Sequence, residues 1–303
     1  MILATTFASA VGALRAAGEP TRLRILALLA RAELTVGEIC QVLGQSQPRV
    51  SRHLKVLAAA GLLDRFREEH WVYYRVPVDG VPSETVRQLL SLASQSDPTF
   101  VRDRERMATV ITDRAREVSD RTPQEGAAPP EWIKSLVSQE LGEQPIGALL
   151  DVGTGSGHLL EVLAPQATRA VGVDISSDAL KLARTNVHGA GLSHCELHKG
   201  SIYDLPFAAS SFDTATIDRL LASAERPLAA LSELARAMKP SGRVLIIEDF
   251  DALQDSHANP IMTLRQWLTT AGFSCKRIHP LDTESKHLLV TVAERVSAAS
   301  AAA

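Results

Sequence analysis

Cysteine is scarce in this sequence of 303 residues: the three that occur are Cys40, Cys195 and Cys275, and they lie far apart. An odd, scattered set gives neither a disulfide framework nor the Cys-x-x-Cys spacing of a zinc site. Such cysteine usage is typical of proteins in a reducing compartment. We therefore predict a cytoplasmic protein without a metal site.

Long apolar runs are also missing. No segment approaches the ~20 apolar residues that a membrane-spanning helix needs, so no membrane partner is expected. The N-terminal segment Met1–Phe7 has no basic region, and we interpret it as part of the folded chain rather than as a signal peptide. With 303 residues, 45% hydrophobic and 22% charged, the chain has the size and composition of two globular domains.

The net charge is small, formally −3, but it is unevenly distributed. Residues 1–95 hold eleven Lys and Arg against eight Asp and Glu, whereas residues 131–303 hold fifteen against twenty. Between Leu43 and Arg67, five basic side chains stand against Asp64 alone. A local basic patch on a mildly acidic chain predicts a segment that binds phosphates.

The first part of the chain predicts short helices followed by a hairpin. Thr35-Val36-Gly37-Glu38 has the pattern of a capping box, which opens a helix. Ser46 is predicted to cap a second helix, with Pro48 in its first turn, where no backbone donor is needed. The β-branched and aromatic run Leu63–Val76 predicts a two-stranded hairpin that turns near Glu69. Two helices and a hairpin in this order indicate a winged helix-turn-helix, an α+β domain.

The second of these helices has two distinct faces. Val50, Leu54 and Leu57 cluster on one side of the helical wheel, and short polar or basic side chains cover the other. A surface helix with solvated charges is one interpretation, but the capped helix before it and the hairpin after it favour DNA binding. The predicted DNA-binding residues are Gln47, Pro48, Ser51, Arg52 and Lys55 of the helix and Arg65 and Arg67 of the hairpin.

Four segments of this region together resemble the ArsR/SmtB winged-helix regulators. They are Arg22–Leu26, Ser46–Leu54, Leu57–Leu62 and Trp71–Arg75. The resemblance implies a homodimer, paired through the first helix and the helix after the wing, on double-stranded operator DNA. It also implies contacts from the recognition helix at Gln47, Ser51 and Arg52.

The sequence departs from this family in two places. Arsenic-sensing members carry Cys-x-Cys in the helix that here has the segment Glu33–Glu38, so no metal sensing through that site is expected. The wing tip is Glu69-His70, where similar sequences often have Gly followed by Arg, which weakens the expected contact with phosphate.

Two further helices are predicted after the hairpin. Residues 82–95 form the first, and residues 98–119 form a charged helix with a single apolar stripe. Such a stripe predicts packing on another element or, alternatively, a dimer contact. The segment Thr122–Pro130, rich in Pro and Gly, predicts a linker.

From Ile146 onward, apolar strands alternate with amphipathic helices. This alternation predicts βαβ units and an α/β doubly wound, Rossmann-like sheet. The predicted strands are 148–152, 170–174, 195–198, 212–217 and 244–247, with two more at 274–279 and 287–292.

The first of these strands runs into a glycine-rich turn, Asp151-Val152-Gly153-Thr154-Gly155-Ser156-Gly157. Glycines allow the backbone to turn sharply and to approach a ligand closely. The dinucleotide fingerprint Gly-x-Gly-x-x-Gly is not met, because His158 stands at its third position. Asp174 ends the next predicted strand, where a carboxylate can accept hydrogen bonds from both hydroxyls of a ribose.

Together with the segments Ser201–Phe207, Ser211–Asp213 and Met238–Val244, this pattern resembles the class I S-adenosylmethionine-dependent methyltransferases. The resemblance implies a seven-stranded sheet with an antiparallel last strand. It implies S-adenosylmethionine or S-adenosylhomocysteine as the bound cofactor.

The resemblance also assigns a role to each motif residue. The amino-acid moiety would be held by Asp151, Gly153, Gly155 and Gly157. Asp174 would hold the ribose, Ile175, Ser201 and Ile202 would border the adenine, and Asp218 would lie near the sulfonium. Many members have Gly-Asp where this chain has Gly200-Ser201, and a hydroxyl accepts hydrogen bonds more weakly than a carboxylate. We interpret Asp213, His158 and His198 as structural residues.

These features predict four segments. They are a winged helix-turn-helix DNA-binding domain over 1–95, a helical connector and linker over 96–130, an S-adenosylmethionine-binding, methyltransferase-like domain over 131–296, and a disordered tail over 297–303.

The sequence has neither Asn/Asp-Pro-Pro-Tyr/Phe nor a nucleophilic Pro-Cys, so DNA-base methylation is not expected. Three hypotheses remain. The chain is a transcriptional regulator, expected to be a repressor, that senses the adenosyl ligand; or it is a small-molecule methyltransferase tethered to a DNA-binding dimer; or its second domain is a scaffold that binds no ligand. No methyl acceptor and no catalytic residue is predicted.

Overall fold

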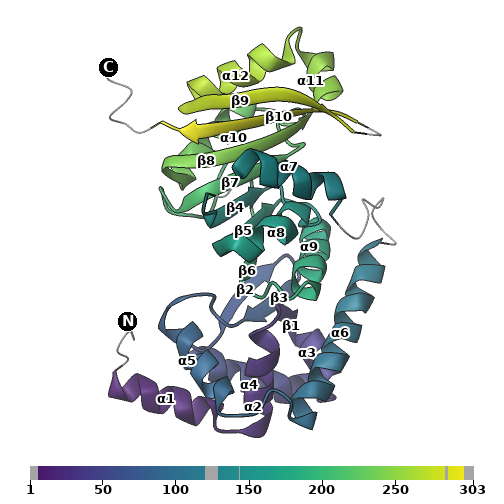
Figure 1. The fold of residues 1–303 in the computed structure, drawn as a ribbon. Coiled ribbons are helices and arrows are strands. Elements are labelled where there is room, and N and C mark those ends of the chain that lie inside the picture. Colours follow the sequence, from purple (N-terminus) through teal and green to yellow (C-terminus); the bar gives the residue numbers. More distant parts are fainter. Residues whose placement is uncertain (1–5, 120–128, 143, 284–285, 297–303) are drawn as a thin grey trace. The chain divides into compact units, whose positions relative to one another are not determined.

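The computed structural model describes residues 6–119, 129–142, 144–283 and 286–296. The chain divides into two compact units, Met1–Pro123 with Val187–His194, and Gln124–Asn186 with Cys195–Ala303, which we describe separately (Figure 1). Most of the predicted linker Thr122–Pro130 and the whole predicted tail 297–303 lie outside the described residues.

The first unit combines helices with a small antiparallel sheet in which the strand order is β1-β3-β2. Its elements are α1 (Phe7–Ala17), α2 (Pro20–Leu29), β1 (Leu34–Thr35), α3 (Val36–Leu43), α4 (Gln47–Ala59), β2 (Asp64–Glu68), β3 (Trp71–Arg75), α5 (Gly80–Ser91) and α6 (Pro98–Ser119). Helices α3 and α4 form the predicted helix-turn-helix, and β2 and β3 form the predicted hairpin. Glu69, in the turn between these strands, has a φ of +50°. Helix α5 begins and ends earlier than the predicted 82–95.

The capping box at the start of α3 forms as predicted. The Thr35 hydroxyl accepts the Glu38 N–H at 3.3 Å, and the Glu38 carboxylate accepts the Thr35 N–H at 2.7 Å. The helix ends at Gly44, whose φ of +64° is left-handed and favours glycine.

Ser46 occupies the N-cap position of α4, but its hydroxyl makes no capping hydrogen bond to any described residue, so this part of the prediction is wrong. The reason lies in the first turn of the helix. Pro48 has no N–H to donate, and the Arg49 N–H donates instead to the Ser46 carbonyl at 3.1 Å.

Helix α6 packs against α2 and α3. Met107 and Ile111 of α6 are buried in the same hydrophobic cluster as Leu26 and Ile39. The apolar stripe of α6 therefore belongs to the core of the first unit, as the first of the two interpretations of that stripe predicts.

The second unit is built on a seven-stranded sheet in the order β6-β5-β4-β7-β8-β10-β9. Its elements are α7 (Glu131–Leu141), β4 (Gly147–Val152), α8 (His158–Leu163), β5 (Ala167–Asp174), α9 (Ser177–Gly189), β6 (Cys195–Lys199), β7 (Phe212–Asp218), α10 (Pro227–Ala237), β8 (Met238–Asp249), α11 (Phe250–Ser256), α12 (Pro260–Thr270), β9 (Phe273–Asp282) and β10 (His287–Arg295). A 3₁₀ turn, Ala164–Gln166, separates α8 from β5.

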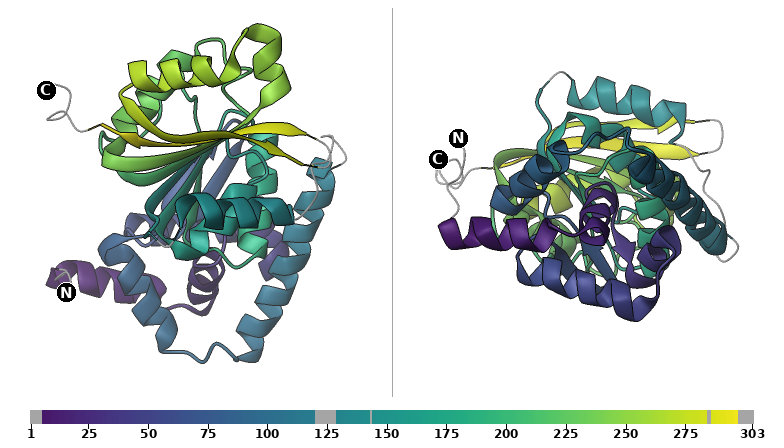
Figure 2. Two further views of the ribbon diagram at one scale, coloured as in Figure 1. Left: turned by 45° about the horizontal axis from the view of Figure 1, so that its top comes forward. Right: turned by 90° about the horizontal axis from the view of Figure 1, so that it is seen from below.

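Strands β4 to β8 pair in parallel, and β10 runs antiparallel to both of its neighbours. Helices α10, α11 and α12 cover one face of this sheet, and α7 and α8 lie on the other (Figure 2). The strands carry buried aliphatic side chains on both faces, as expected of a sheet covered on both sides. The predicted fold class, a winged helix-turn-helix followed by a doubly wound methyltransferase-type domain, is confirmed.

Candidate functional site

The outer face of α4 carries the predicted DNA-binding residues. Val50, Leu54 and Leu57 are fully buried against the first unit's core. The exposed positions of the helix include all five that were predicted: Gln47, Pro48, Ser51, Arg52 and Lys55. The structure thus brings these side chains together on one solvent-facing surface.

Two basic residues of β2 share one face of the hairpin. Arg65 and Arg67 are exposed and two positions apart, so their side chains leave the strand on the same side. The Arg67 guanidinium also donates to the Glu69 carbonyl at 2.8 Å. This bond ties Arg67 to the wing turn and leaves Arg65 as the residue with greater freedom to reach a phosphate.

The glycine-rich turn follows β4 at the carboxyl edge of the sheet. Gly153, Gly155 and Gly157 have φ values of +71°, +52° and +83°, which explains glycine at each position. A Cβ on Gly153 would lie 2.8 Å from the Leu220 side chain. A Cβ on Gly155 would make an ordinary van der Waals contact with the Gly153 carbonyl oxygen, 3.9 Å away.

A cavity of about 460 Å³ opens beside this turn. Four of the predicted cofactor-binding residues, Asp151, Gly153, Gly155 and Asp218, line it. Its described lining also includes Thr154, Ser156, His158, Leu159, Arg219, Ala222, Ser223, Glu248, Asp249, Ala252 and Lys286. It does not include the other predicted residues, which are Gly157, Asp174, Ile175, Ser201 and Ile202.

Asp151 lies at the floor of the cavity and is almost completely buried. Its two carboxylate oxygens each accept a hydroxyl hydrogen bond of 2.6 Å, one from Thr154 and one from Thr216. Burial raises the pKa of Asp151 to about 6, although these hydrogen bonds favour the ionised form.

Glu248, at the end of β8, is fully buried and was missed by the sequence analysis. Its carboxylate accepts the backbone N–H groups of Leu220, Leu221 and Ala222, at 3.0, 2.6 and 3.3 Å. Burial raises the pKa of Glu248 to about 7 against the effect of these bonds, and the charge of Asp218 contributes to the rise. The available signal was an acidic residue directly after the apolar run Val244–Ile247, at the carboxyl edge of a predicted parallel strand.

Asp218 and Arg219 form an ion pair at the end of β7, with both carboxylate oxygens 3.0 Å from guanidinium nitrogens. Arg219 has a φ of +50°, and its N–H donates to the Ile247 carbonyl at 2.7 Å. The next residue, Leu220, packs over Gly153. The segment after β7 and the glycine turn after β4 therefore meet beside the cavity.

The residues predicted to hold the ribose and adenine lie at the ends of β5 and β6. Asp174 accepts the Gly155 N–H at 2.9 Å and the Ser176 N–H at 2.8 Å, so it anchors the glycine turn. Ile175 is 71% exposed, and Ile202 packs against the hydrophobic core. The Ser201 hydroxyl accepts the Tyr203 N–H at 3.2 Å.

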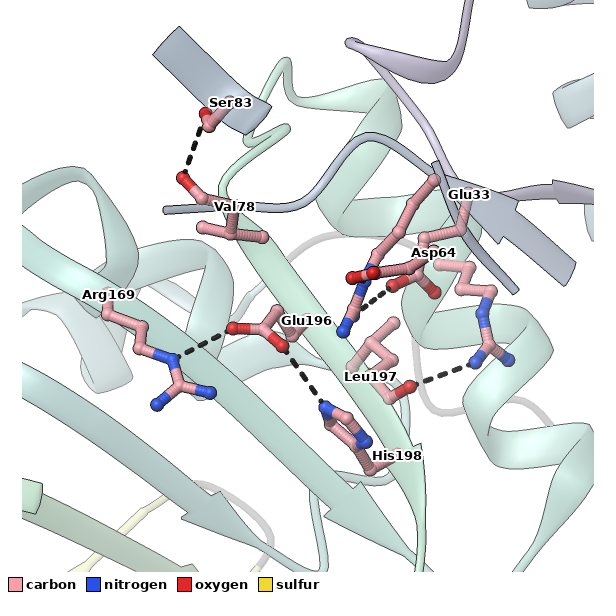
Figure 3. A network of polar contacts seen from close by, with 10 residues as sticks. Glu33, Asp64, Val78, Ser83, Arg169, Glu196, Leu197 and His198 are labelled. Atoms are coloured by element: carbon pink, nitrogen blue, oxygen red, sulfur yellow. Dashed lines mark hydrogen bonds and ion pairs between the residues drawn. The ribbon is translucent and has the colours of Figure 1, made fainter. Parts of the chain in front are cut away.

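The three side chains interpreted as structural have local partners. Asp213 accepts the Ala148 N–H at 2.9 Å and pairs with Lys239. In Figure 3 the Glu196 carboxylate lies between Arg169, at 2.8 Å, and His198, at 3.3 Å. His158 is buried in the cavity lining.

Two features are absent from the described part of the chain. No three His, Cys, Asp or Glu side chains are grouped there as a metal ion would need. No helix there is long and apolar enough to cross a bilayer.

Comparisons with known proteins match a family to part of each unit. Residues 19–65 match the family described as "Bacterial regulatory protein, arsR family", and residues 150–246 match the family described as "Methyltransferase domain". The chain carries an ArsR-type helix-turn-helix and a class I methyltransferase domain. The methyltransferase domain supports S-adenosylmethionine as the cofactor, and the helix-turn-helix supports DNA binding.

Individual relatives match part of this chain over part of their own length. The "uncharacterized methyltransferase YcgJ" of Bacillus subtilis is 28% identical over 120 residues, which are 39% of this chain and 47% of the relative. The "ubiquinone/menaquinone biosynthesis C-methyltransferase UbiE" of Geotalea daltonii is 33% identical over 121 residues, 39% of this chain and 51% of the relative. The crystal structure of YcgJ from Bacillus subtilis covers 55% of this chain and 100% of its own, with 13% identity and a TM-score of 0.48. The chain spans about a third to a half of the length of the curated relatives it matches.

Proposed function

We propose that the protein is a DNA-binding transcriptional regulator, acting as a repressor, whose methyltransferase domain binds S-adenosylmethionine or S-adenosylhomocysteine as a sensed ligand. The α4 face would read the operator, and the cavity beside the glycine turn would receive the ligand. Ligand occupancy would then change operator affinity.

The state of the cavity carboxylates is the observation that carries this proposal. Methyl transfer to a hydroxyl or amine is commonly assisted by a base that can reach the acceptor. Here each carboxylate already has a partner: Asp151 has two hydroxyls, Glu248 three amides, Asp218 a guanidinium, and Asp249 the Ala252 N–H at 3.1 Å. These partners hold the carboxylates in fixed orientations, which suits a site that binds a ligand in one position.

The residues around the cavity suit an adenosyl amino acid. Asp151 and the amides and hydroxyls of the glycine turn would face its amino-acid end. Gly155 lines the cavity, and because it has no side chain it would let the ligand backbone approach closely. The ribose and adenine would lie outside the enclosed part of the cavity. Asp174 would hold the ribose, and the adenine would be bordered by Ile175, Ser201 and Ile202. When bound, S-adenosylmethionine would supply an activated methyl group.

The alternative is a small-molecule methyltransferase tethered to a DNA-binding unit. Relatives are named as a ubiquinone/menaquinone biosynthesis C-methyltransferase and as a demethylmenaquinone methyltransferase. The cavity also extends past the glycine turn to Ala222, Ser223 and Ala252, where an acceptor could lie. A scaffold role without ligand is the third hypothesis.

One experiment separates the three functions. The full chain would be titrated with each adenosyl compound by calorimetry, with and without a duplex that the chain has selected from a randomised pool. A sensor must show reciprocal coupling: the duplex changes ligand affinity by the same factor by which the ligand changes duplex affinity. Binding without coupling would favour the tethered enzyme, and no binding of either compound would favour the scaffold.

Arg52→Ala is expected to weaken binding of the selected duplex by about 1–3 kcal/mol, because a side chain that reads a base edge contributes that much to discrimination. Binding to random duplex should change less. The measurement is a pair of fluorescence-anisotropy titrations at one fixed salt concentration.

Arg49→Ala is the matched control. Arg49 is exposed on the same helix and carries the same charge, but it lies on the flank of the recognition face. The Arg49→Ala variant should lower the affinity for the selected duplex and for random duplex by the same factor. If Arg52→Ala behaves in that way too, Arg52 contacts phosphate and its assignment as a base contact is wrong.

We also propose a homodimer paired through α1 and α5. Large hydrophobic side chains are exposed on α1 and at the end of α5: Phe7 at 86%, Leu14 at 58% and Leu92 at 81%. Leu14 and Leu92 border an apolar groove of about 560 Å³ between these helices. Contiguous exposed apolar surface of this kind is unusual on a monomer.

Leu92→Glu is therefore expected to convert a dimer into a monomer in sedimentation velocity, because it would place a charge in the apolar interface. Leu228→Glu, at an exposed leucine of α10, is the control and should leave the mass unchanged. A monomeric wild type, or a variant that remains dimeric, would contradict the proposed interface.

A further inference from the structure

The cavity beside the glycine turn has an excess of negative charge. Its described lining contains four carboxylates, Asp151, Asp218, Glu248 and Asp249, and two cations, Arg219 and Lys286. Arg219 is committed to Asp218. The cavity is therefore more suited to a cation than to a neutral or anionic group.

The two buried carboxylates are fixed in place. Both oxygens of Asp151 are bound by threonine hydroxyls, and Glu248 is bound by three consecutive amides. Their charges cannot turn away from the cavity, and their burial limits screening by water. Asp249, by contrast, is partly exposed and caps α11.

The two candidate ligands differ in the charge at their sulfur atom, to which a negatively charged cavity would respond. S-adenosylmethionine carries a sulfonium methyl group with a positive charge, whereas its demethylated product, S-adenosylhomocysteine, has a neutral thioether. The rest of the two molecules is the same. We propose that the cavity selects the cationic methyl donor over its neutral product, and that Glu248 is the main determinant of this preference. The inference rests on the proposed function and deepens it, because it names the sensed ligand.

Protonation should control this preference. Glu248 and Asp151 have pKa values of about 7 and about 6, both raised mainly by burial, so each gains negative charge as the pH rises through that range. A bound cation favours the ionised carboxylate, which means that binding releases a proton when it occurs below the pKa. Asp151 would face the amino-acid end that both compounds share, so its titration should change both affinities alike. The difference between the two ligands then follows Glu248, and affinity for the sulfonium compound must rise with pH more steeply than affinity for the thioether.

Other charged groups face Glu248 from the neighbouring elements. Asp218 and Arg219 lie on β7 and just after it, and Asp151 lies on β4. Asp249 follows Glu248 on β8, His158 starts α8, and Lys286 precedes β10. Glu248 combines full burial with a pKa raised to about 7, so its titration dominates near neutral pH.

The test is calorimetric titration of the full chain at about pH 5.5, 6.5 and 7.5. The probes are S-adenosylmethionine, S-adenosylhomocysteine and sinefungin, an analogue with an ammonium group in place of the sulfonium methyl. We expect the sulfonium compound and sinefungin to bind at least ~10-fold more tightly at the highest pH than at the lowest. The thioether should change by no more than ~4-fold over the same range, which is the most that titration of Asp151 alone allows.

Glu248→Gln separates charge from structure. It retains an oxygen that can accept amide hydrogen bonds but has no charge to lose. It should reduce the preference for the cationic ligands by about tenfold at the highest pH and flatten their pH profile. Asp255→Asn, on the exposed side of α11, removes one charge outside the cavity lining and should change neither.

The outcomes are distinct. Equal affinity of wild type for both adenosyl compounds at every pH would overturn the charge proposal and leave the proposed function intact. So would an equal loss of both affinities in Glu248→Gln, because that would show a purely structural role. Failure of wild type to bind either compound would reject the proposed function itself.

Discussion

Replacing Asp174 with alanine is expected to weaken S-adenosylhomocysteine binding at least about tenfold in calorimetry while leaving the fold intact. A carboxylate that accepts two ribose hydroxyls makes two charge-assisted hydrogen bonds, each contributing about 1.5–3 kcal/mol. A tenfold change in affinity corresponds to ~1.4 kcal/mol, so even partial compensation by water would leave a measurable loss.

The structure adds a second reason for a large effect. Each oxygen of Asp174 already accepts one backbone N–H, from Gly155 or from Ser176. A carboxylate oxygen has capacity for a further hydrogen bond, so the ribose hydroxyls can still be accepted. Alanine would remove these acceptors and would also release the amide that fixes the glycine turn.

Two variants separate these contributions. Asp174→Asn retains one acceptor oxygen but not the charge and should lose less affinity than Asp174→Ala. Asp178→Ala, an acidic residue in the first turn of α9, is the control, and its ligand affinity should equal that of wild type. Wild-type affinity in Asp174→Ala would refute the assignment of this carboxylate to the ribose.

Much of the fold could be predicted because the local signals agree with one another. Residues close in sequence determine three features of the first unit. These are the capping box at Thr35, the left-handed glycine at Gly44 and the amphipathic pattern of α4. In the second unit, the glycines after β4 sit where the backbone has positive φ values. Local geometry of this kind is encoded locally, and it gave the element order and the fold class.

The parts that sequence analysis missed depend on residues distant in the chain. Glu248 looks like an ordinary strand-end residue until folding brings Leu220–Ala222 over it. The same holds for the lining of the cavity. Strands β4, β7 and β8 lie side by side, and their arrangement decides which of the predicted residues line the cavity. The pattern of one strand carries no information about such contacts, and the roles of the predicted site residues remain predictions.

The position of α6 also depends on contacts between segments far apart in sequence. We predicted that the DNA-binding domain ends at residue 95, with a connector after it. In the structure Asp103 binds the α2 residue Arg24 through both oxygens at 2.7 Å, and Arg114 binds the capping-box residue Glu38 at 2.7 Å. We therefore propose that the DNA-binding domain extends through α6, to residue 119.

Arg24→Ala tests this extended domain and is expected to destabilise the α2–α6 contact by about 3–5 kcal/mol. The reason is the burial of the partner: Asp103 is 2% exposed, and without Arg24 its carboxylate would lack a countercharge in a nonpolar setting. The pairing is also strong enough to raise the pKa of Arg24 above its usual value. The measurement is hydrogen exchange of the full chain by mass spectrometry, where the peptides of α2 and α6 should exchange roughly a hundredfold faster or more.

The exposed pair of Arg87 and Glu84 on α5 provides the matched control, because Arg87→Ala removes an ion pair whose arginine is 77% exposed. Exposed pairs contribute about 0–1 kcal/mol, so exchange should hardly change. The double variant Arg24→Met with Asp103→Leu should recover most of the lost protection, since apolar side chains of similar size can replace a buried pair without an unpaired charge. If Arg24→Ala changes the exchange rates of the α2 and α6 peptides no more than Arg87→Ala does, α6 contributes little to the stability of the first unit. The DNA-binding domain would then end at residue 95, as the sequence predicts.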